Sequence, residues 1–407
     1  MRKAAICLTA LLLTSALVSL APAAHSSTDN PKPPLNPVRL IFIHHSTGEN
    51  WLADDNGGLG IALRDNNYFV SDTNYDWGPD AIGSLTDLGH WWLWFRGPDS
   101  STYLNAVYAE GEQHSGYLRM DSAPEGENEI VMFKSCFPNS ALMGDPNDPV
   151  PPIESNPLRG QDSGSEYHTV ANAKGIYVDL LEYFWTRQDK LFVVITAPPQ
   201  SDPTYSSNAR AFNEWLMHDW LRDYPHNNVF VFDFYNVLTT NGGSPDVNDL
   251  GEEAGNHHRW WHDAIQHKID DDNDENPNVL EYPTEDDHPS RAGNLKATAE
   301  YLPLLNVAYN RWKGTSAIPT TTTHITETRP PLTTIQTTVR ETEAETTTPP
   351  PPATTGPFPT ELLLVVAVAL IVIVAVGMLV MRRRNIAAPH RSNMSLTSRL
   401  SRLAHQY

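Results

Sequence analysis

Short apolar runs alternate with longer, helix-like segments across residues 37–314. Five of these runs have the length of a β-strand, at 38–43 (VRLIFI), 67–71 (NYFVS), 129–135 (EIVMFKS), 191–197 (LFVVITA) and 228–234 (NVFVFDF). Nearly continuous hydrophobicity is typical of strands that are buried on both faces of a parallel sheet. The pattern therefore predicts an α/β fold, a three-layer α/β/α sandwich around a mostly parallel five-stranded sheet.

Three longer segments, at 170–187, 208–223 and 291–312, have the apolar spacing expected of helices. Pro303 is expected to kink or split the last of them, because proline removes a helical hydrogen bond. Helices that alternate with parallel strands cover both faces of the sheet, and ligands bind at the carboxyl ends of the strands. Ser46, in the stretch FIHHSTG, directly follows the first predicted strand and is a candidate residue at that edge.

The two ends of the chain differ from this middle part. Residues 1–23 combine a basic start, an apolar run and a small-residue motif, so they predict a secretory signal peptide, with an uncleaved anchor as the alternative. Residues 315–360 are rich in Thr and Pro and predict a disordered stalk without a core. Residues 361–381 contain a long uncharged apolar run and predict a transmembrane helix.

The tail after this run, residues 382–407, contains six arginines and no acidic residue. The positive-inside rule places such a tail in the cytoplasm, so residues 24–314 are predicted to form an extracellular domain. The whole chain has a net charge of −21, which argues against nucleic acid as a partner. We therefore expect a single-pass protein of the cell membrane whose large domain faces outward.

Cysteine and histidine usage gives no sign of a disulfide or a metal site. Cys136 is the one cysteine outside the signal region, and we interpret it as a small buried apolar residue. His258 and His262 have the spacing of two ligands on one helix face. The glutamate of a zinc-protease motif and the glycine of a calcium loop are both missing nearby, so a solvated acidic loop without metal is expected.

Three polar stretches follow predicted strands or precede a predicted helix, in chain order. They are FIHHSTG with Ser46, FKSCFPNS with Asn139, and DDHPSRAGN with His288. Together they resemble the SGNH or GDSL-type hydrolases over about residues 38–312. The chain departs from the family pattern, because HHS replaces Gly-Asp-Ser, FPNS replaces Gly-x-Asn-Asp, and Glu285 replaces the aspartate three residues before the histidine.

The resemblance implies a flavodoxin-like fold and a role for each matching residue. Ser46 would be the nucleophile and His288 the general base, while the Asn139 amide and the backbone N–H of Gly78 would hold the oxyanion. Gly83 and Gly89 are alternatives to Gly78. Taken singly, the residues also have plain structural interpretations, since Ser46 suits a helix N-cap and Asn139 suits a turn.

Three carboxylates precede His288 and are candidates for the triad acid. Glu285 has the three-residue spacing of the family, whereas Asp286 is two residues away and needs a tight bend. Asp287 is adjacent, and a neighbouring side chain generally diverges from the ring. The spacing favours Glu285 over Asp286.

The predicted function is that of a membrane-anchored serine esterase that needs no cofactor and no metal. Its substrate would be an ester on a glycan, a lipid or a small molecule. Tryptophans at 89–98 (GHWWLWFRGP) and 259–263 (RWWHD) are the one hint of carbohydrate, because aromatic faces stack on sugar rings. The alternative is an inactive protein of the same fold that binds glycans or partners through these tryptophans.

Overall fold

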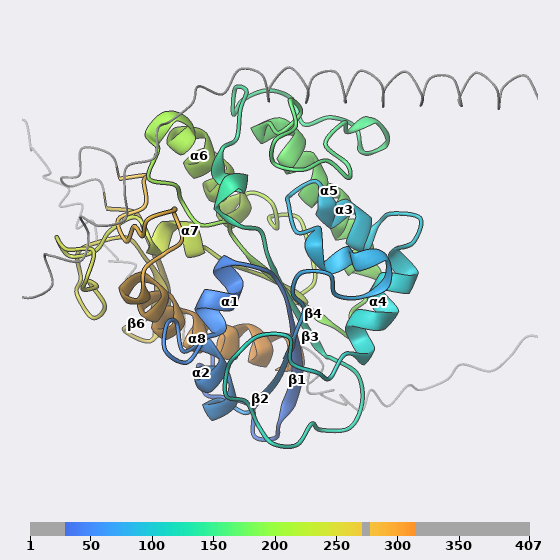
Figure 1. The fold of residues 1–407 in the computed structure, drawn as a ribbon, viewed down its shortest axis with the longest axis vertical. Helices are drawn as coiled ribbons and strands as arrows, with labels where there is room; N and C mark the ends of the chain where they lie inside the picture. Colours follow the sequence, from blue (N-terminus) through green and yellow to red (C-terminus); the bar gives the residue numbers. More distant parts are fainter. Residues whose placement is uncertain (1–28, 271–276, 315–407) are drawn as a thin grey trace, which may run out of the picture. The chain divides into compact units, whose positions relative to one another are not determined.

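Five parallel strands form the centre of the fold in the computed structural model, which describes residues 29–270 and 277–314 (Figure 1). Their order across the sheet is β2-β1-β3-β4-β5, and every neighbouring pair is parallel. This result confirms the predicted α/β class and the parallel five-stranded sheet. The strands are β1 (Val38–Ile43), β2 (Tyr68–Asp72), β3 (Ile130–Lys134), β4 (Leu191–Ile195) and β5 (Val229–Phe232).

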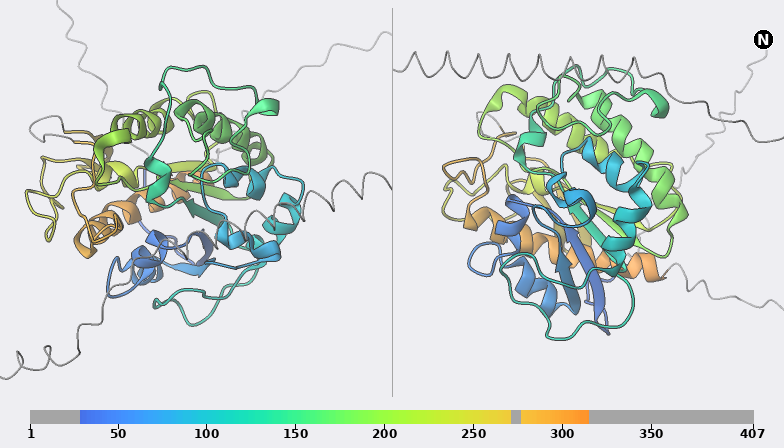
Figure 2. Two further views of the ribbon diagram at one scale, coloured as in Figure 1. Left: turned by 45° about the horizontal axis from the view of Figure 1, so that its top comes forward. Right: turned by 45° about the vertical axis from the view of Figure 1, so that its right-hand side comes forward.

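Helices cover both faces of the sheet. Successive strand residues point to opposite sides, so each face packs against its own group of helices. Leu40 and Phe42 pack with one group of helices, whereas Ile41 and Ile43 pack with the other. Figure 2 shows the strands between these two groups. The first group is α1 (Thr47–Leu52), α2 (Leu59–Asp65), α7 (Phe234–Val237) and α8 (Arg291–Gly314); the second is α3 (His90–Phe95), α4 (Ser100–Ala109), α5 (Val170–Thr186) and α6 (Ser206–His218).

The predicted helices are present, with shifted ends. The segment predicted at 208–223 is α6, which begins at Ser206 and ends at His218. The expected split at Pro303 is wrong, since α8 runs through this proline as one helix. Tyr301 and Leu305, on either side of it, are fully buried in the core, and we attribute the continuity of the helix to this packing, which offsets the lost hydrogen bond.

Short 3₁₀ turns and one hairpin complete the described elements. The turns are η1 (Pro79–Ser84), η2 (Phe137–Ser140), η3 (Ile153–Ser155) and η4 (Pro203–Tyr205). The hairpin pairs β6 (His257–Trp261) with β7 (Ala264–Lys268), antiparallel. His258 and His262 lie on this hairpin and not on a helix, so their four-residue spacing does not place them on one helix face. In residues 29–270 and 277–314, no group of three or more His, Cys, Asp or Glu is arranged to hold a metal ion.

The expected membrane-associated parts lie outside the described residues. These are the signal peptide at 1–23, the stalk at 315–360, the helix at 361–381 and the tail at 382–407. In the part of the chain that the structure describes, no helix is both long enough and apolar enough to span a membrane.

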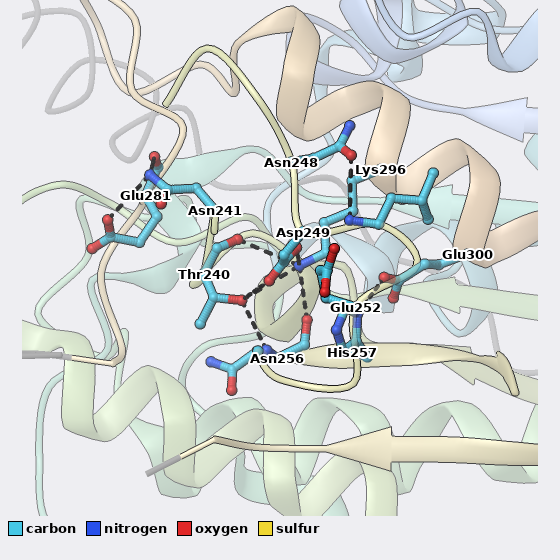
Figure 3. Close-up of polar contacts among 12 residues, drawn as sticks. Thr240, Asn241, Asn248, Asp249, Glu252, Asn256, His257, Glu281, Lys296 and Glu300 are labelled. Atoms are coloured by element: carbon cyan, nitrogen blue, oxygen red, sulfur yellow. Dashed lines mark hydrogen bonds and ion pairs between the residues drawn. The ribbon is translucent and has the colours of Figure 1, made fainter. Parts of the chain in front are cut away.

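A buried polar network ties α8 to the loop that follows α7 (Figure 3). Nζ of Lys296 lies 2.5 Å from Oδ1 of Asp249, and the two side chains are 0% and 3% exposed. Lys296 also donates to the carbonyl oxygen of Asn256 at 2.9 Å, and Thr240 donates to Asp249 at 2.5 Å. Burial lowers the pKa of Lys296. The network therefore holds α8 in place, and the loop before this helix contains His288.

Lys296→Met is expected to lower the free energy of unfolding by about 3–5 kcal/mol, since it leaves the Asp249 carboxylate buried without its partner. Chemical denaturation of the full chain measures the effect. Lys313→Met is the matched control, because Lys313 pairs with Glu129 at the surface, where both side chains are about 40% exposed, and such pairs contribute less than about 1 kcal/mol. Equal losses in the two variants would contradict this account of the network.

Candidate active site

Ser46 connects β1 to α1 in a strained backbone conformation. Its φ of 50° and ψ of −103° are rare for a residue with a side chain, at a cost of about 1–3 kcal/mol. The hydroxyl forms no cap hydrogen bond with α1. Instead, Oγ is hydrogen-bonded to Nε2 of His288, which lies 242 residues further along the chain. The interpretation of Ser46 as an ordinary helix cap is therefore wrong.

The residues around Ser46 explain the local sequence HHSTG. His44 is fully buried, and its Nε2 lies 3.2 Å from Oδ2 of Asp72 at the end of β2. A Cβ at Gly48 would lie 2.4 Å from the Cβ of His44, so only glycine fits at this position. His45 stacks on the ring of Tyr75 at a centroid distance of 4.6 Å. These contacts fix the turn on which the Ser46 hydroxyl is presented.

His288 lies in the loop before α8, and a carboxylate orients its ring. Nδ1 of His288 lies 2.8 Å from Oδ1 of Asp286. Oγ1 of Thr284 lies 3.0 Å from the same carboxylate oxygen and 2.7 Å from the carbonyl oxygen of His288. The ring of Phe137 packs edge-on against His288 at 5.1 Å. Ser46, His288 and Asp286 thus form one hydrogen-bonded series.

The preference for Glu285 as the orienting acid is corrected by this geometry, because the contact with His288 is made by Asp286. The reason is the backbone of Asp287, whose φ of 65° is left-handed and folds the chain back on itself. This is the tight bend that a two-residue spacing needs. Asp287 accepts a hydrogen bond from the Ser201 N–H at 3.0 Å, which anchors the bend to the loop after β4.

Asn139 was expected to donate to the oxyanion, and the structure places its amide elsewhere. Nδ2 donates to Oδ1 of Asp87 at 2.6 Å and to the carbonyl oxygen of Cys136 at 3.3 Å. Oδ1 accepts from the Leu88 N–H at 2.8 Å. Both amide hydrogens are therefore engaged, and the side chain joins the loop after β3 to the loop before α3.

The glycines expected at the oxyanion site have other roles. Gly78 directly precedes η1, has a φ of 77° and is not among the residues that line the pocket at Ser46. A Cβ on Gly83 or Gly89 would lie 2.2 Å from a backbone carbonyl oxygen of Asn74 or Leu158, respectively, so close packing requires glycine at both positions. The sequence assignment of Gly78 thus gains no geometric support.

A surface pocket of about 550 Å³ opens at Ser46. Apart from Pro289, every residue that lines it has a polar group. The lining residues are Ser46, Glu49, Asn50, Asn56, Tyr75, Thr284, Asp286, His288, Pro289, Ser290 and Arg291. The pocket therefore offers several hydrogen-bonding partners to a bound molecule.

Cys136 is buried, as expected, but it is not an isolated apolar residue. Burial raises the pKa of its thiol, whereas the hydrogen bond with His288, the Lys134 ammonium group and Thr47 lower it, with a net result of about 6. Lys134 is itself buried, which lowers its pKa to about 8. No sequence motif indicates this environment, since His288 approaches Cys136 from a distant part of the chain.

This environment changes the basicity of His288. The hydrogen bond with Cys136 raises the pKa of His288 above its usual 6.5, burial lowers it, and Asp286 raises it again, so that the net shift is upward. A general base acts only when it is neutral. Activity that depends on neutral His288 should therefore fall as the pH drops through the pKa of His288, which lies above 6.5.

Cys136→Ala is expected to move the acid limb of the pH profile to lower pH, because it removes the largest cause that raises the pKa of His288. The profile of kcat/KM for the full chain measures the shift. Cys136→Ser should behave like the alanine variant, since a serine hydroxyl does not ionise in this range. An acid limb that stays in place in both variants would contradict the coupling of Cys136 to His288.

Comparisons with known proteins assign no family to the chain. No protein-family model matches it, and no curated protein matches it. A solved crystal structure is similar at 13% identity over 69% of this chain and 97% of its own, with a TM-score of 0.27. Because a likeness this distant carries no argument, the function has to be inferred from the geometry of the site.

Proposed function

We propose that the chain is a serine ester hydrolase with the flavodoxin-like fold of the SGNH class. The observation that carries the proposal is the hydrogen-bonded series of Ser46, His288 and Asp286 beside a surface pocket. The strand order β2-β1-β3-β4-β5 supports it, because this order is that of flavodoxin-like folds. The position of Ser46 just beyond a parallel strand also suits the edge at which such folds bind ligands.

In the proposed reaction, Oγ of Ser46 attacks the acyl carbon while its proton passes to Nε2 of His288. The carbonyl electron pair moves onto the oxygen, and when it returns the ester C–O bond breaks. His288 then gives its proton to the leaving alkoxide, and water releases the acyl group by the same steps. Asp286 keeps the proton of His288 on Nδ1 and stabilises the imidazolium. These side chains supply the nucleophile, the base and the orienting acid, so the proposal needs no cofactor or metal.

The polar side chains at the pocket suit an ester whose alcohol is hydrophilic, such as a partly acetylated sugar. Glu49, Asn50, Asn56 and Arg291 provide donors and acceptors for hydroxyl groups. A lipid acyl chain would need an apolar channel to gain binding energy from burial. The tryptophan hint is weakened, however, because Trp91 and Trp94 are fully buried in the core.

The burial of Trp91 and Trp94 removes two of the tryptophans on which the alternative of an inactive glycan-binding protein rests, whereas Trp92, Trp260 and Trp261 are half-buried. Nε1 of Trp91 donates to Oγ of Ser135 at 2.9 Å, and Nε1 of Trp94 donates to the carbonyl oxygen of Leu85 at 2.6 Å. Both side chains are therefore structural and offer no face to a sugar.

Steady-state hydrolysis of a panel of esters by the full chain tests the proposal. We expect turnover of acetyl esters of sugars and small alcohols, with a lower kcat/KM for esters of long fatty acids. A preference for long acyl chains would overturn the substrate class. Absence of hydrolysis across the whole panel would overturn the esterase function.

We further propose that the domain is displayed on the cell surface by the apolar run Leu362–Met381, which lies outside the described residues. The arginines at 382–384 directly after this run support a cytoplasmic tail. Protease added to intact cells should release the domain while an epitope on the tail stays protected. A tail epitope that antibodies reach from outside would reverse the orientation.

A further inference from the structure

The strained turn at Ser46 has to be held by contacts on both sides of it, because such a conformation persists only when the surrounding structure fixes it. Before Ser46, the side chain of His44 is fixed by Asp72 at the end of β2, with 3.2 Å between Nε2 and Oδ2. After Ser46, Thr47 is the first residue of α1 and is fully buried. The contact that fixes Thr47 comes from β3, the strand on the other side of β1.

Lys134, the last residue of β3, makes this contact. Its Nζ donates to Oγ1 of Thr47 and to the carbonyl oxygen of Ser135, the latter at 3.0 Å. The side chain is 1% exposed and lies on the sheet face that α1 covers, since Met132, two residues earlier, packs on that face. The ammonium group also lies 5.7 Å from the centre of the Phe234 ring on α7. Lys134 therefore joins the start of α1 to the loop after β3.

The Lys134 ammonium group has no carboxylate partner in the described part of the chain, because its hydrogen bonds go to a hydroxyl and to a carbonyl oxygen. Burying a cation without an anion costs free energy, and this burial lowers the pKa of Lys134 to about 8. An apolar side chain would fill the same space without this cost, so packing alone does not account for a lysine here. Perturbed charged groups of this kind cluster at functional sites.

We propose that Lys134 is a positioning residue that holds Thr47, and with it the nucleophilic hydroxyl, in place for attack on the ester. This inference rests on the proposed function, since it concerns the same reaction. An ammonium group suits the role because its hydrogen bonds are stronger than those of a neutral donor, and because it has three hydrogens to share between two loops. The Ser135 contact extends the effect to the loop after β3, where Phe137 packs on His288 at a centroid distance of 5.1 Å. Lys134 thus fixes the loop of the nucleophile relative to the loop that packs on the base.

Lys134→Met is the test, because methionine gives a long side chain without the charge or the hydrogen-bond donors. We expect kcat on an acetyl ester to fall about 10- to 100-fold, the scale of a small displacement of a reacting group. KM should change little, because Lys134 is buried and does not line the pocket. The midpoint of chemical denaturation of the full chain should not fall, since the variant removes a buried cation and leaves no unpaired charge. A merely structural lysine would lower stability and activity together.

Lys174→Met is the matched control. Nζ of Lys174 also donates to a backbone carbonyl oxygen, that of Pro146 at 2.8 Å, and it lies 5.8 Å from the ring centre of Trp215. Lys174 is on α5 and does not line the pocket. Its replacement should therefore leave kcat at the wild-type value.

Variants of Thr47 test the same contact from its other side. Thr47→Val keeps the shape of the side chain and removes the hydroxyl, so it should lower kcat as much as Lys134→Met does, and the double variant should lose no more than either. Thr47→Ser keeps the hydroxyl and should lose less than Thr47→Val. Losses that multiply in the double variant would overturn the proposed contact, as would equal losses in Thr47→Ser and Thr47→Val.

Failure of this inference is distinguishable from failure of the proposed function. If the wild type hydrolyses the ester and Lys134→Met has the same kcat, the esterase function stands and the role of Lys134 is overturned. A fall in kcat that is matched by a fall in the denaturation midpoint, or a rise in KM alone, also overturns it. If the wild type neither hydrolyses esters nor reacts with a fluorophosphonate probe, the proposed function fails and the inference falls with it.

Discussion

Ser46→Ala is expected to lower kcat on an acetyl ester by about five to six powers of ten, to the level that remains when a catalytic serine is removed. The expected loss follows from the position of Oγ, which is hydrogen-bonded to the base and lines the pocket. The fold should be unaffected, because the hydroxyl caps no helix and its hydrogen bond is made to the side chain of His288. Steady-state kinetics and circular dichroism of the full chain measure the two properties.

Ser101→Ala serves as the matched control for this variant. Ser101 is an exposed serine on α4 and does not line the pocket. Wild-type activity in the control and a loss in Ser46→Ala would assign the reaction to Ser46. A Ser46→Ala protein that keeps more than about one hundredth of the wild-type kcat would contradict the assignment, since residual catalysis after removal of the nucleophile is far smaller.

Asp286→Asn is expected to lower kcat by about two to three powers of ten, while Glu285→Gln retains activity close to the wild type. Asparagine at 286 can donate a hydrogen bond to Nδ1 and so favours the wrong tautomer of His288. We expect a smaller loss than the roughly 10⁴-fold effect at a buried triad acid, because the Asp286 side chain is 67% exposed and water shares its role.

Comparison of the two variants tells whether His288 is oriented by Asp286, which contacts it in the structure, or by Glu285, which has the family spacing. The two carboxylates are neighbours in the same loop, so the comparison is direct. Kinetics of both proteins under identical conditions provide the comparison. A greater loss in Glu285→Gln would return the role to Glu285, as the family spacing suggested. Near-full activity in both variants would mean that His288 works without either acid.

The fold could be predicted from the sequence because its signal is local. The apolar runs at 38–43 and 191–197 are buried on both faces of the sheet, and such strands need no knowledge of distant residues to be recognised. The hairpin of β6 and β7 has no continuous apolar run to indicate it, because the buried residues of β6 are the polar His257, His258 and Arg259 and β7 is exposed or half-buried. The continuity of α8 through Pro303 depends on core packing, which a local pattern does not contain.

The part of the site that could be predicted is the part that depends on the order of the motifs along the chain and on the positions of the strand ends. Ser46 and His288 meet because each flanks the carboxyl edge of the sheet. The role of Asp286 depends on the left-handed backbone of Asp287, and no sequence pattern here specified that conformation. The capture of the Asn139 amide by Asp87 joins two loops 52 residues apart, so motif spacing gave no sign of it.

The contact between Cys136 and His288 had no local signal in the sequence, because the groups that lower the pKa of the thiol come from the loop before α8, from β3 and from α1. Where the chain departs from the family motif, the geometry assigns roles that the motif does not.

The most direct test of the central claim is mass spectrometry of the full chain after reaction with a fluorophosphonate probe, which modifies only activated nucleophiles. Ser46 is activated by its hydrogen bond to His288, so the account predicts a single adduct on the peptide that contains Ser46 and no adduct in Ser46→Ala. An adduct that persists in Ser46→Ala, or an unmodified wild type beside a reference serine hydrolase that reacts fully, would contradict the claim that Ser46 is a catalytic nucleophile.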